Sequence, residues 1–210
     1  MRGVWTFGIG ATSLAVAIVA GSCMAGPEVG RKAPSFSGLM GVDDKEHALA
    51  DYADAKAVVV VFTCNHCPVA KAYEDRLIAL QSDYRSKGVQ LIAINANSPK
   101  KVPQDGFAEM KQRAAGENLG DWRTTDEPFN YPYLVDSTQE VAKAYGATCT
   151  PHVFVLDPSR NLAYTGAIDD NMKADKVKES FLRDALDAIL AGEQPAKPVT
   201  RQFGCGIKWE

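Results

Sequence analysis

Runs of apolar residues alternate with polar segments along the chain, and their lengths and spacings predict strands and helices. Residues 58–62, four valines and a phenylalanine, form the continuous run expected for a strand buried on both faces. Apolar side chains then recur at helical spacing from Val69 to Tyr84, which predicts a helix ending near Gly88. Residues 89–95 predict a second buried strand. This order, with short connections, implies a parallel pair joined by a right-handed crossover.

The second half of the chain predicts shorter elements. They are a helix around 104–115, a strand over 131–135, a short helix over 138–145 ending at Gly146, strands over 152–156 and 161–166, and a final amphipathic helix from Val177 to Ile189 that stops at Gly192. The turn-forming residues 157–160 join the last two strands, which predicts an antiparallel hairpin. The pattern as a whole is that of an α/β fold.

The first 25 residues stand apart from this pattern. The chain carries no charge between Arg2 and Glu28, and residues 14–20 form a short apolar stretch, which is typical of a secretory signal cleaved after Ala25. The apolar stretch is shorter than the roughly 20 residues of a spanning helix, so an uncleaved anchor is less favoured. Residues 20–23 also resemble a bacterial lipobox, in which Cys23 would carry a lipid. Export to the periplasm or cell envelope follows, with membrane contact only through a lipid anchor or an uncleaved signal.

Composition adds limits to this picture. With 210 residues, 46% hydrophobic and 23% charged, the chain suits one soluble domain of ordinary size, expected over 26–195 and followed by a tail over 196–210. A net charge of −3 without a lysine or arginine block argues against nucleic acid as a partner. Three histidines are too few for a histidine-rich metal store.

The candidate chemistry lies directly after the first strand, where Cys64 and Cys67 form a C-x-x-C motif. A helix N-terminus presents unpaired N–H groups and a partial positive charge, which stabilise the reactive thiolate. His66 is a second potential stabiliser and would make the disulfide more oxidising. Pro68 marks the helix start. No second C-x-x-C or Cys/His pair stands at zinc-finger spacing, so the sequence predicts a redox-active dithiol without metal or cofactor.

Export changes the count of cysteines that can pair. Without Cys23, four remain, and four cysteines can pair in three ways. The simplest assignment is a redox-active Cys64–Cys67 pair and a structural Cys149–Cys205 disulfide that ties the tail back. Closing a loop of that span could contribute roughly 4 kcal/mol. Cys149 as a third redox thiol is an open alternative.

A strand ending in C-x-x-C, a β-α-β unit and a later Thr150-Pro151 resemble the thioredoxin fold. The lead-in over 29–36 is similar to the opening of redoxin domains, the TlpA-like and AhpC/TSA-like group that also contains peroxiredoxins. The resemblance covers roughly 28–192 and implies a central mixed sheet flanked by helices, an N-terminal extension and an insertion before the third core strand. It implies that Cys64 attacks a substrate disulfide, that Cys67 resolves the mixed disulfide, and that Thr150-Pro151 is a cis-proline loop facing the dithiol. The implied substrates are protein or peptide thiols and disulfides, with a separate redox partner protein.

Departures from the thioredoxin pattern keep two other functions open. Thr63 replaces the usual tryptophan and the valine run supplies no buried acid, so proton transfer at Cys67 needs another group or water. A copper or metal chaperone of thioredoxin-like fold has a cysteine pair ending in Cys-Pro, but with C-x-x-x-C spacing and a distant histidine, which His152 could supply. A thiol peroxidase is third. Peroxiredoxins carry a Pro-x-x-x-Thr-x-x-Cys pattern, but with Cys67 as its cysteine this chain has Cys64 in place of the threonine and Val60 in place of the proline, which counts against a dedicated peroxidase.

Overall fold

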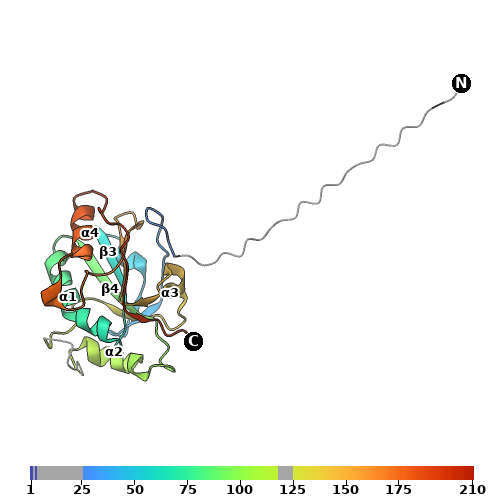
Figure 1. Cartoon of the computed structure of the whole chain (residues 1–210). Coiled ribbons are helices and arrows are strands. Elements are labelled where there is room, and N and C mark those ends of the chain that lie inside the picture. The colour runs from blue at the N-terminus through green and yellow to red at the C-terminus, as the bar shows by residue number, and fades with distance from the viewer. Residues whose placement is uncertain (2, 4–25, 118–124) are drawn as a thin grey trace.

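The computed structural model describes residues 1, 3, 26–117 and 125–210 (Figure 1). Within these ranges a seven-stranded mixed sheet has the order β2-β1-β5-β4-β3-β7-β8. Its strands are β1 (Leu39–Gly41), β2 (Glu46–His47), β3 (Ala57–Phe62), β4 (Val89–Asn95), β5 (Tyr133–Val135), β7 (His152–Leu156) and β8 (Leu162–Gly166). A separate two-stranded ribbon pairs β6 (Cys149–Thr150) with β9 (Cys205–Gly206).

Helices cover both faces of the sheet. They are α1 (Pro68–Arg85), α2 (Phe107–Ala114), α3 (Glu140–Tyr145) and α4 (Phe181–Leu190), with short 3₁₀ helices η1 (Leu49–Tyr52), η2 (Pro103–Asp105) and η4 (Ala174–Lys176). Side chains of α1, α2 and α4 pack on the face that carries Val59 and Val61. Side chains of α3 and η1 pack on the face that carries Val58 and Val60. Figure 1 shows α1 and α4 on one side of the sheet and α3 on the other.

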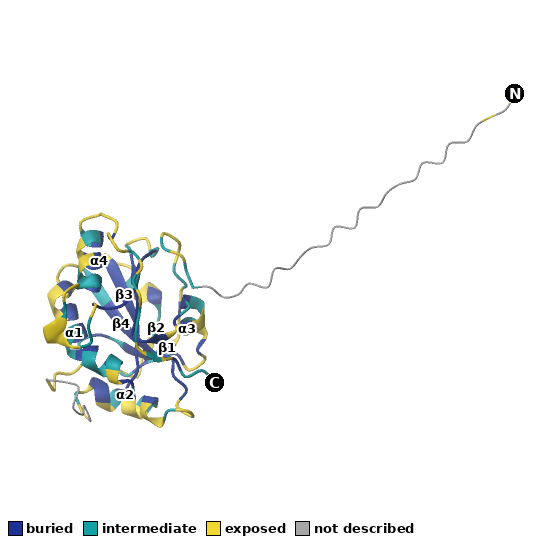
Figure 2. Cartoon of the chain, in the orientation of Figure 1, coloured by how far each residue is buried: buried dark blue, intermediate teal, exposed yellow. Residues whose placement is uncertain are grey.

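Strand β3 lies at the centre of this arrangement. It pairs in parallel with β4, with Val60 opposite Ile92, and antiparallel with β7, with Val60 opposite Phe154. All six of its residues are buried, and β3 and β4 form the dark core in Figure 2. The predicted buried strand, the parallel β-α-β pair and the mixed sheet flanked by helices are therefore confirmed. Alternating β-branched side chains fill both faces, which is why the run is continuously apolar.

Two helices begin later than predicted. Gly106 is the N-cap of α2, so residues 103–105 form a separate 3₁₀ turn instead of the first turn of the helix. The final helix begins at Phe181 rather than at Val177. The Asp170 carboxylate accepts hydrogen bonds from the N–H groups of Lys178 and Glu179, which hold this segment outside the helix. Strands β1, β2 and β9 are not predicted, because two or three residues are too short to show an alternating pattern.

The signal predicted over 1–25, with the lipidation candidate Cys23, lies outside the described residues except for residues 1 and 3. In the described part of the chain, no helix combines the length and the apolar character that crossing a bilayer requires.

A buried ion pair joins α2 to α1. The Arg113 guanidinium donates to both carboxylate oxygens of Glu74, from Nε at 2.5 Å and from Nη2 at 2.8 Å. Both side chains are about 95% buried. A bidentate pair of this kind fixes distance and orientation together. By fixing α2, the ion pair also helps to position η2 and its last residue, Asp105, which is separated from α2 only by the N-cap residue Gly106.

Replacing Arg113 with methionine should lower the free energy of unfolding by about 3–5 kcal/mol, because the buried Glu74 carboxylate loses the positive charge and the two hydrogen bonds of Arg113. Urea unfolding followed by circular dichroism measures this change. The matched control is Arg183→Met, which removes an exposed pair with Asp83 and should cost less than about 1 kcal/mol. Equal losses in the two variants would contradict the role given to the Glu74–Arg113 pair.

Candidate active site

The junction between β3 and α1 holds the two cysteines of the C-x-x-C motif. Cys64 follows the end of β3, and Cys67 is the N-cap of α1, whose first residue is Pro68. Cys64 is 1% exposed and Cys67 is 0% exposed, and both are free thiols. The strand–helix placement is the predicted one. The helix, however, begins after Cys67, so Cys67 and not Cys64 occupies the helix N-terminus.

The loop that contains Thr150 and Pro151 faces this dithiol. The Thr150–Pro151 peptide bond is cis. The Thr150 hydroxyl lies 3.0 Å from the Cys64 sulfur, and the Cys67 thiol donates to the Thr150 carbonyl oxygen at 3.3 Å. The fold thus brings Cys64, Cys67 and the Thr150-Pro151 loop together, although the loop comes more than 80 residues later in the sequence.

A buried carboxylate that the sequence analysis did not identify also belongs to the site. Asp105, at the end of η2, is 1% exposed. Its Oδ1 accepts the backbone N–H groups of Asn65 at 2.7 Å and His66 at 3.1 Å. Its Oδ2 lies 2.6 Å from Nδ1 of His66 and accepts from the Asn97 amide at 2.8 Å. Asp105 lies in the insertion between β4 and β5, whereas β3 itself contains no acidic residue.

Nothing local marks Asp105 in the sequence. It lies in a Pro-Gln-Asp-Gly segment, and such residues are typical of turns. Its contacts with the motif are formed only when the insertion folds back. The amide of Asn95, the last residue of β4, donates to the Asp105 carbonyl at 3.2 Å and helps to hold it there. The role of Asp105 can therefore be recognised only in the folded protein, where it is buried and hydrogen-bonded to the motif loop and to residues at and after the end of β4.

The two thiols of the motif differ in acidity. The pKa of Cys67 is lowered by a hydrogen bond with the Cys64 thiol, and the Cys205 thiol and the Ala70 N–H act in the same direction. Burial raises the pKa of Cys64, and its hydrogen bond with Cys67 and the negative charge of Asp105 add to this effect. When one of the two thiols ionises, the negative charge therefore forms on Cys67, at the helix N-terminus, which favours it.

His152 is buried beside Phe154 and is not a member of the cluster that contains His66 and Asp105. Its Nδ1 accepts the Thr148 N–H at 3.4 Å, and its Nε2 lies 3.2 Å from the Thr165 hydroxyl. Burial lowers the pKa of His152 to about 4, so the ring is neutral at physiological pH. These contacts make it a satisfied core histidine.

The predicted disulfide between Cys149 and Cys205 is not present: both are free thiols in the structure. In the β6–β9 ribbon Cys149 lies opposite Gly206, and Cys205 lies opposite Thr150. Because successive side chains point to opposite faces of a strand, this register places the two cysteines on opposite faces. In place of a covalent bond, backbone pairing between β6 and β9 holds the tail.

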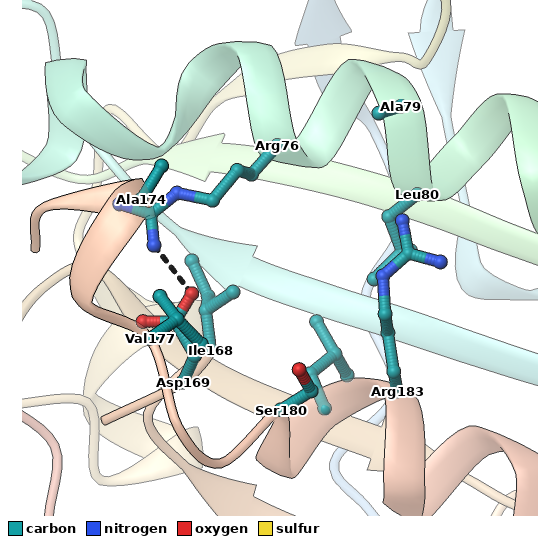
Figure 3. A pocket seen from close by; sticks show the side chains of 10 residues that line it. Arg76, Ala79, Leu80, Ile168, Asp169, Ala174, Val177, Ser180 and Arg183 are labelled. Atoms are coloured by element: carbon teal, nitrogen blue, oxygen red, sulfur yellow. Dashed lines mark hydrogen bonds and ion pairs between the residues drawn. The ribbon is translucent and has the colours of Figure 1, made fainter. Parts of the chain in front are cut away.

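A separate pocket of about 220 Å³ lies between α1 and the segment leading into α4 (Figure 3). Arg76 and Asp169 form an ion pair at one end of it, and Arg183 lies at the other. None of the four cysteines in the described part of the chain lines this pocket, so it is not part of the site described above.

The architecture is thioredoxin-like. A putative thiol:disulfide interchange protein DsbE from Chlorobium tepidum superposes with a TM-score of 0.54 at 17% identity, covering 79% of this chain and 97% of that one. The chain belongs to the AhpC/TSA family, whose model matches residues 29–165. An uncharacterized conserved protein from Geobacillus kaustophilus is 38% identical, with a TM-score of 0.76, over 87% of this chain and 93% of that chain.

A curated relative has a named activity. The thiol-disulfide oxidoreductase ResA of Geobacillus thermodenitrificans (strain NG80-2) is 29% identical over 132 residues, which are 61% of this chain and 63% of that protein. The chain thus matches less than two thirds of the length of this relative.

Replacing Asp105 with asparagine removes the negative charge beside Cys64 at nearly constant size. In a Cys67→Ser background, we expect the Cys64 thiolate to form at lower pH, because this charge raises the pKa of Cys64. Iodoacetamide labelling of Cys64, followed by mass spectrometry across a pH series, should rise several-fold at neutral pH. The control Asp83→Asn changes an exposed carboxylate of α1 and should leave the profile in place. A shift toward higher pH would contradict this account of the charge.

Proposed function

We propose that the protein is an exported thiol–disulfide oxidoreductase that exchanges disulfides with protein or peptide thiols through Cys64 and Cys67. The observation that carries this proposal is the contact of both sulfurs with Thr150, the residue before the cis proline. The name of the ResA relative is consistent with this chemistry. Export rests on the signal pattern of residues 1–25, and Cys23 is the proposed lipid carrier if the segment is a lipoprotein signal.

Exchange would begin with Cys64 attacking a substrate disulfide. The Cys67 thiolate takes the Cys64 proton as the Cys64 sulfur bonds to one substrate sulfur and the other substrate sulfur leaves as a thiolate. The Thr150 hydroxyl lowers the pKa of Cys64 and so favours this step. Cys67 then loses its proton and attacks the Cys64 sulfur. This releases the second substrate thiol and leaves a Cys64–Cys67 disulfide.

His66 and Asp105 suit the handling of the proton. His66 is partly exposed and its Nδ1 contacts the fully buried carboxylate of Asp105. A histidine that touches both solvent and a buried acid can carry a proton between them. This pair therefore takes the role that the sequence left to another group or water. A positive charge on His66 next to the sulfurs would also favour the thiolate form and an oxidising potential.

A titration with glutathione buffers tests the dithiol, followed by trapping in the native host. Wild-type protein should show a defined midpoint for the Cys64–Cys67 disulfide. Cys67→Ser should accumulate mixed disulfides with client proteins, because the resolving thiol is gone. The control Cys64→Ser/Cys67→Ser should accumulate none. A wild-type dithiol that never oxidises across the series would exclude the proposed function, and rapid peroxide consumption by the thiol form would favour the peroxidase instead.

Metal binding is the second candidate, on one specific observation. Ligand atoms of Cys64, His66 and Asp105 all lie within 4.8 Å of one another. A thiolate and an imidazole suit Cu(I) or Zn²⁺. If this is the function, dialysis against either ion should leave one equivalent bound, and Cys64→Ser should lose it. Retention of the ion by Cys64→Ser would exclude this cluster as the site.

A further inference from the structure

The C-terminal tail, residues 196–210, reaches the dithiol through β9. This strand pairs antiparallel with β6, and Cys205 lies opposite Thr150, the residue before the cis proline. Beyond β9, Ile207 is buried, and both the backbone N–H and the backbone carbonyl of Lys208 are hydrogen-bonded. The Lys208 N–H donates to Asn97 Oδ1 at 2.7 Å, and its carbonyl accepts the Ser98 N–H at 2.9 Å. Cys205 is therefore held in a defined position and does not lie on a free end.

Gly204 permits this close approach. A Cβ atom at position 204 would lie 2.1 Å from the Thr150 carbonyl oxygen and 2.6 Å from its carbon. Both are backbone atoms of the loop that contacts the dithiol, so they cannot move aside as a flexible side chain would. The tail and the cis-proline loop fit together only because residue 204 has no side chain.

The Cys205 side chain packs against the dithiol. It packs against the small cluster of Cys64, Cys67 and Ala70, and its proximity lowers the pKa of Cys67. Cys205 is partly exposed, whereas the motif cysteines are almost fully buried. It is thus the cysteine of the cluster that both contacts Cys67 and can be reached from solvent. Cys149 differs in each respect: it is buried and its thiol donates to the Pro151 carbonyl oxygen at 3.5 Å.

We propose that Cys205 is a third redox-active thiol, which exchanges with the Cys64–Cys67 disulfide to form a Cys67–Cys205 disulfide. This proposal rests on the proposed redox function of the dithiol. The new disulfide would lie at the edge of the cluster, where a thiol of the redox partner protein can attack Cys205. Cys205 would thus pass the disulfide between the buried Cys64–Cys67 pair and the redox partner protein, in either direction.

The exchange is balanced within the chain. Cys205 loses its proton to solvent, and its thiolate attacks the Cys67 sulfur. The bond between Cys67 and Cys205 forms as the bond between Cys64 and Cys67 breaks, and Cys64 leaves as a thiolate that takes up a proton. One disulfide is lost and one is formed, so no external oxidant or reductant is needed.

The charge state of Cys67 favours the step in the oxidised protein. In the dithiol, burial raises the pKa of Cys205 to about 11, and the hydrogen bond and negative charge of Cys67 contribute. In the Cys64–Cys67 disulfide, Cys67 carries no charge and that contribution disappears. The Cys205 thiolate therefore forms more readily when it has a disulfide to attack.

Disulfide mapping tests the proposal, because trypsin separates the cysteines. Cys64 and Cys67 share peptide 57–71, Cys149 lies in 144–160, and Cys205 lies in 202–208. Full-length protein is oxidised in glutathione buffer, its free thiols are blocked, and the linked peptides are quantified by mass spectrometry. We expect a linked pair of 57–71 and 202–208 in wild type, and as the main product in Cys64→Ser. Cys67→Ser should reduce this pair to background.

Two further variants complete the design. Cys149→Ser removes the thiol on the opposite face of the ribbon and should leave the linked pair unchanged. Gly204→Ala keeps every thiol but displaces the tail, and it should lower the yield of the linked pair several-fold. If Cys64→Ser gives no linked pair under conditions that oxidise the wild-type dithiol, or if 202–208 links only to 144–160, the proposal is wrong. Oxidation within peptide 57–71 reports the proposed function separately, so a failure of the Cys205 proposal can be distinguished from a failure of the proposed function.

Discussion

The hydrogen bonds of the Asp105 carboxylate hold three separate segments of the chain at one place. Through Asn65 and His66 they fix the loop that carries the cysteines, and through Asn97 they fix the segment after β4. A buried carboxylate is costly unless it is fully hydrogen-bonded, so these contacts cannot be given up one at a time. The Glu74–Arg113 pair then holds the helix that follows Asp105. These polar contacts position the loop that carries the cysteines, and the buried strand β3 precedes that loop.

Asn97 connects this network to the tail. Its amide donates to Asp105, and its Oδ1 accepts the N–H of Lys208. One side chain therefore contacts both the acid beside Cys64 and the segment that presents Cys205. These two hydrogen bonds of Asn97 link the environment of the dithiol to the position of the tail. The C-terminal residues are accordingly a structural part of the site, although they lie beyond the stretch that matches the family model.

The sequence predicts the parts of this site that have local signals. The valine run, the C-x-x-C motif and Pro68 lie together in the chain, so strand, dithiol and helix start can be predicted from adjacent residues. The Thr150-Pro151 loop was found by resemblance to a fold. Asp105 was missed because only long-range hydrogen bonds give it a role. The prediction of a Cys149–Cys205 disulfide depends on the number of cysteines alone. That number does not show how β6 and β9 pair, and the pairing places the two side chains on opposite faces.

The burial of the dithiol limits how a substrate can reach it. A substrate segment that paired with the cis-proline loop, as the thioredoxin resemblance implies, would need the edge of β6 that β9 occupies. Displacing β9 would break the ribbon, expose Ile207 and free Lys208 from Asn97 and Ser98. These losses occur together because the tail is one short segment. Exchange at Cys205 requires none of them, since this side chain already packs against the cluster of Cys64, Cys67 and Ala70 and is partly exposed. A route through the tail therefore retains the contacts that keep the dithiol ordered, whereas direct entry has to break them first.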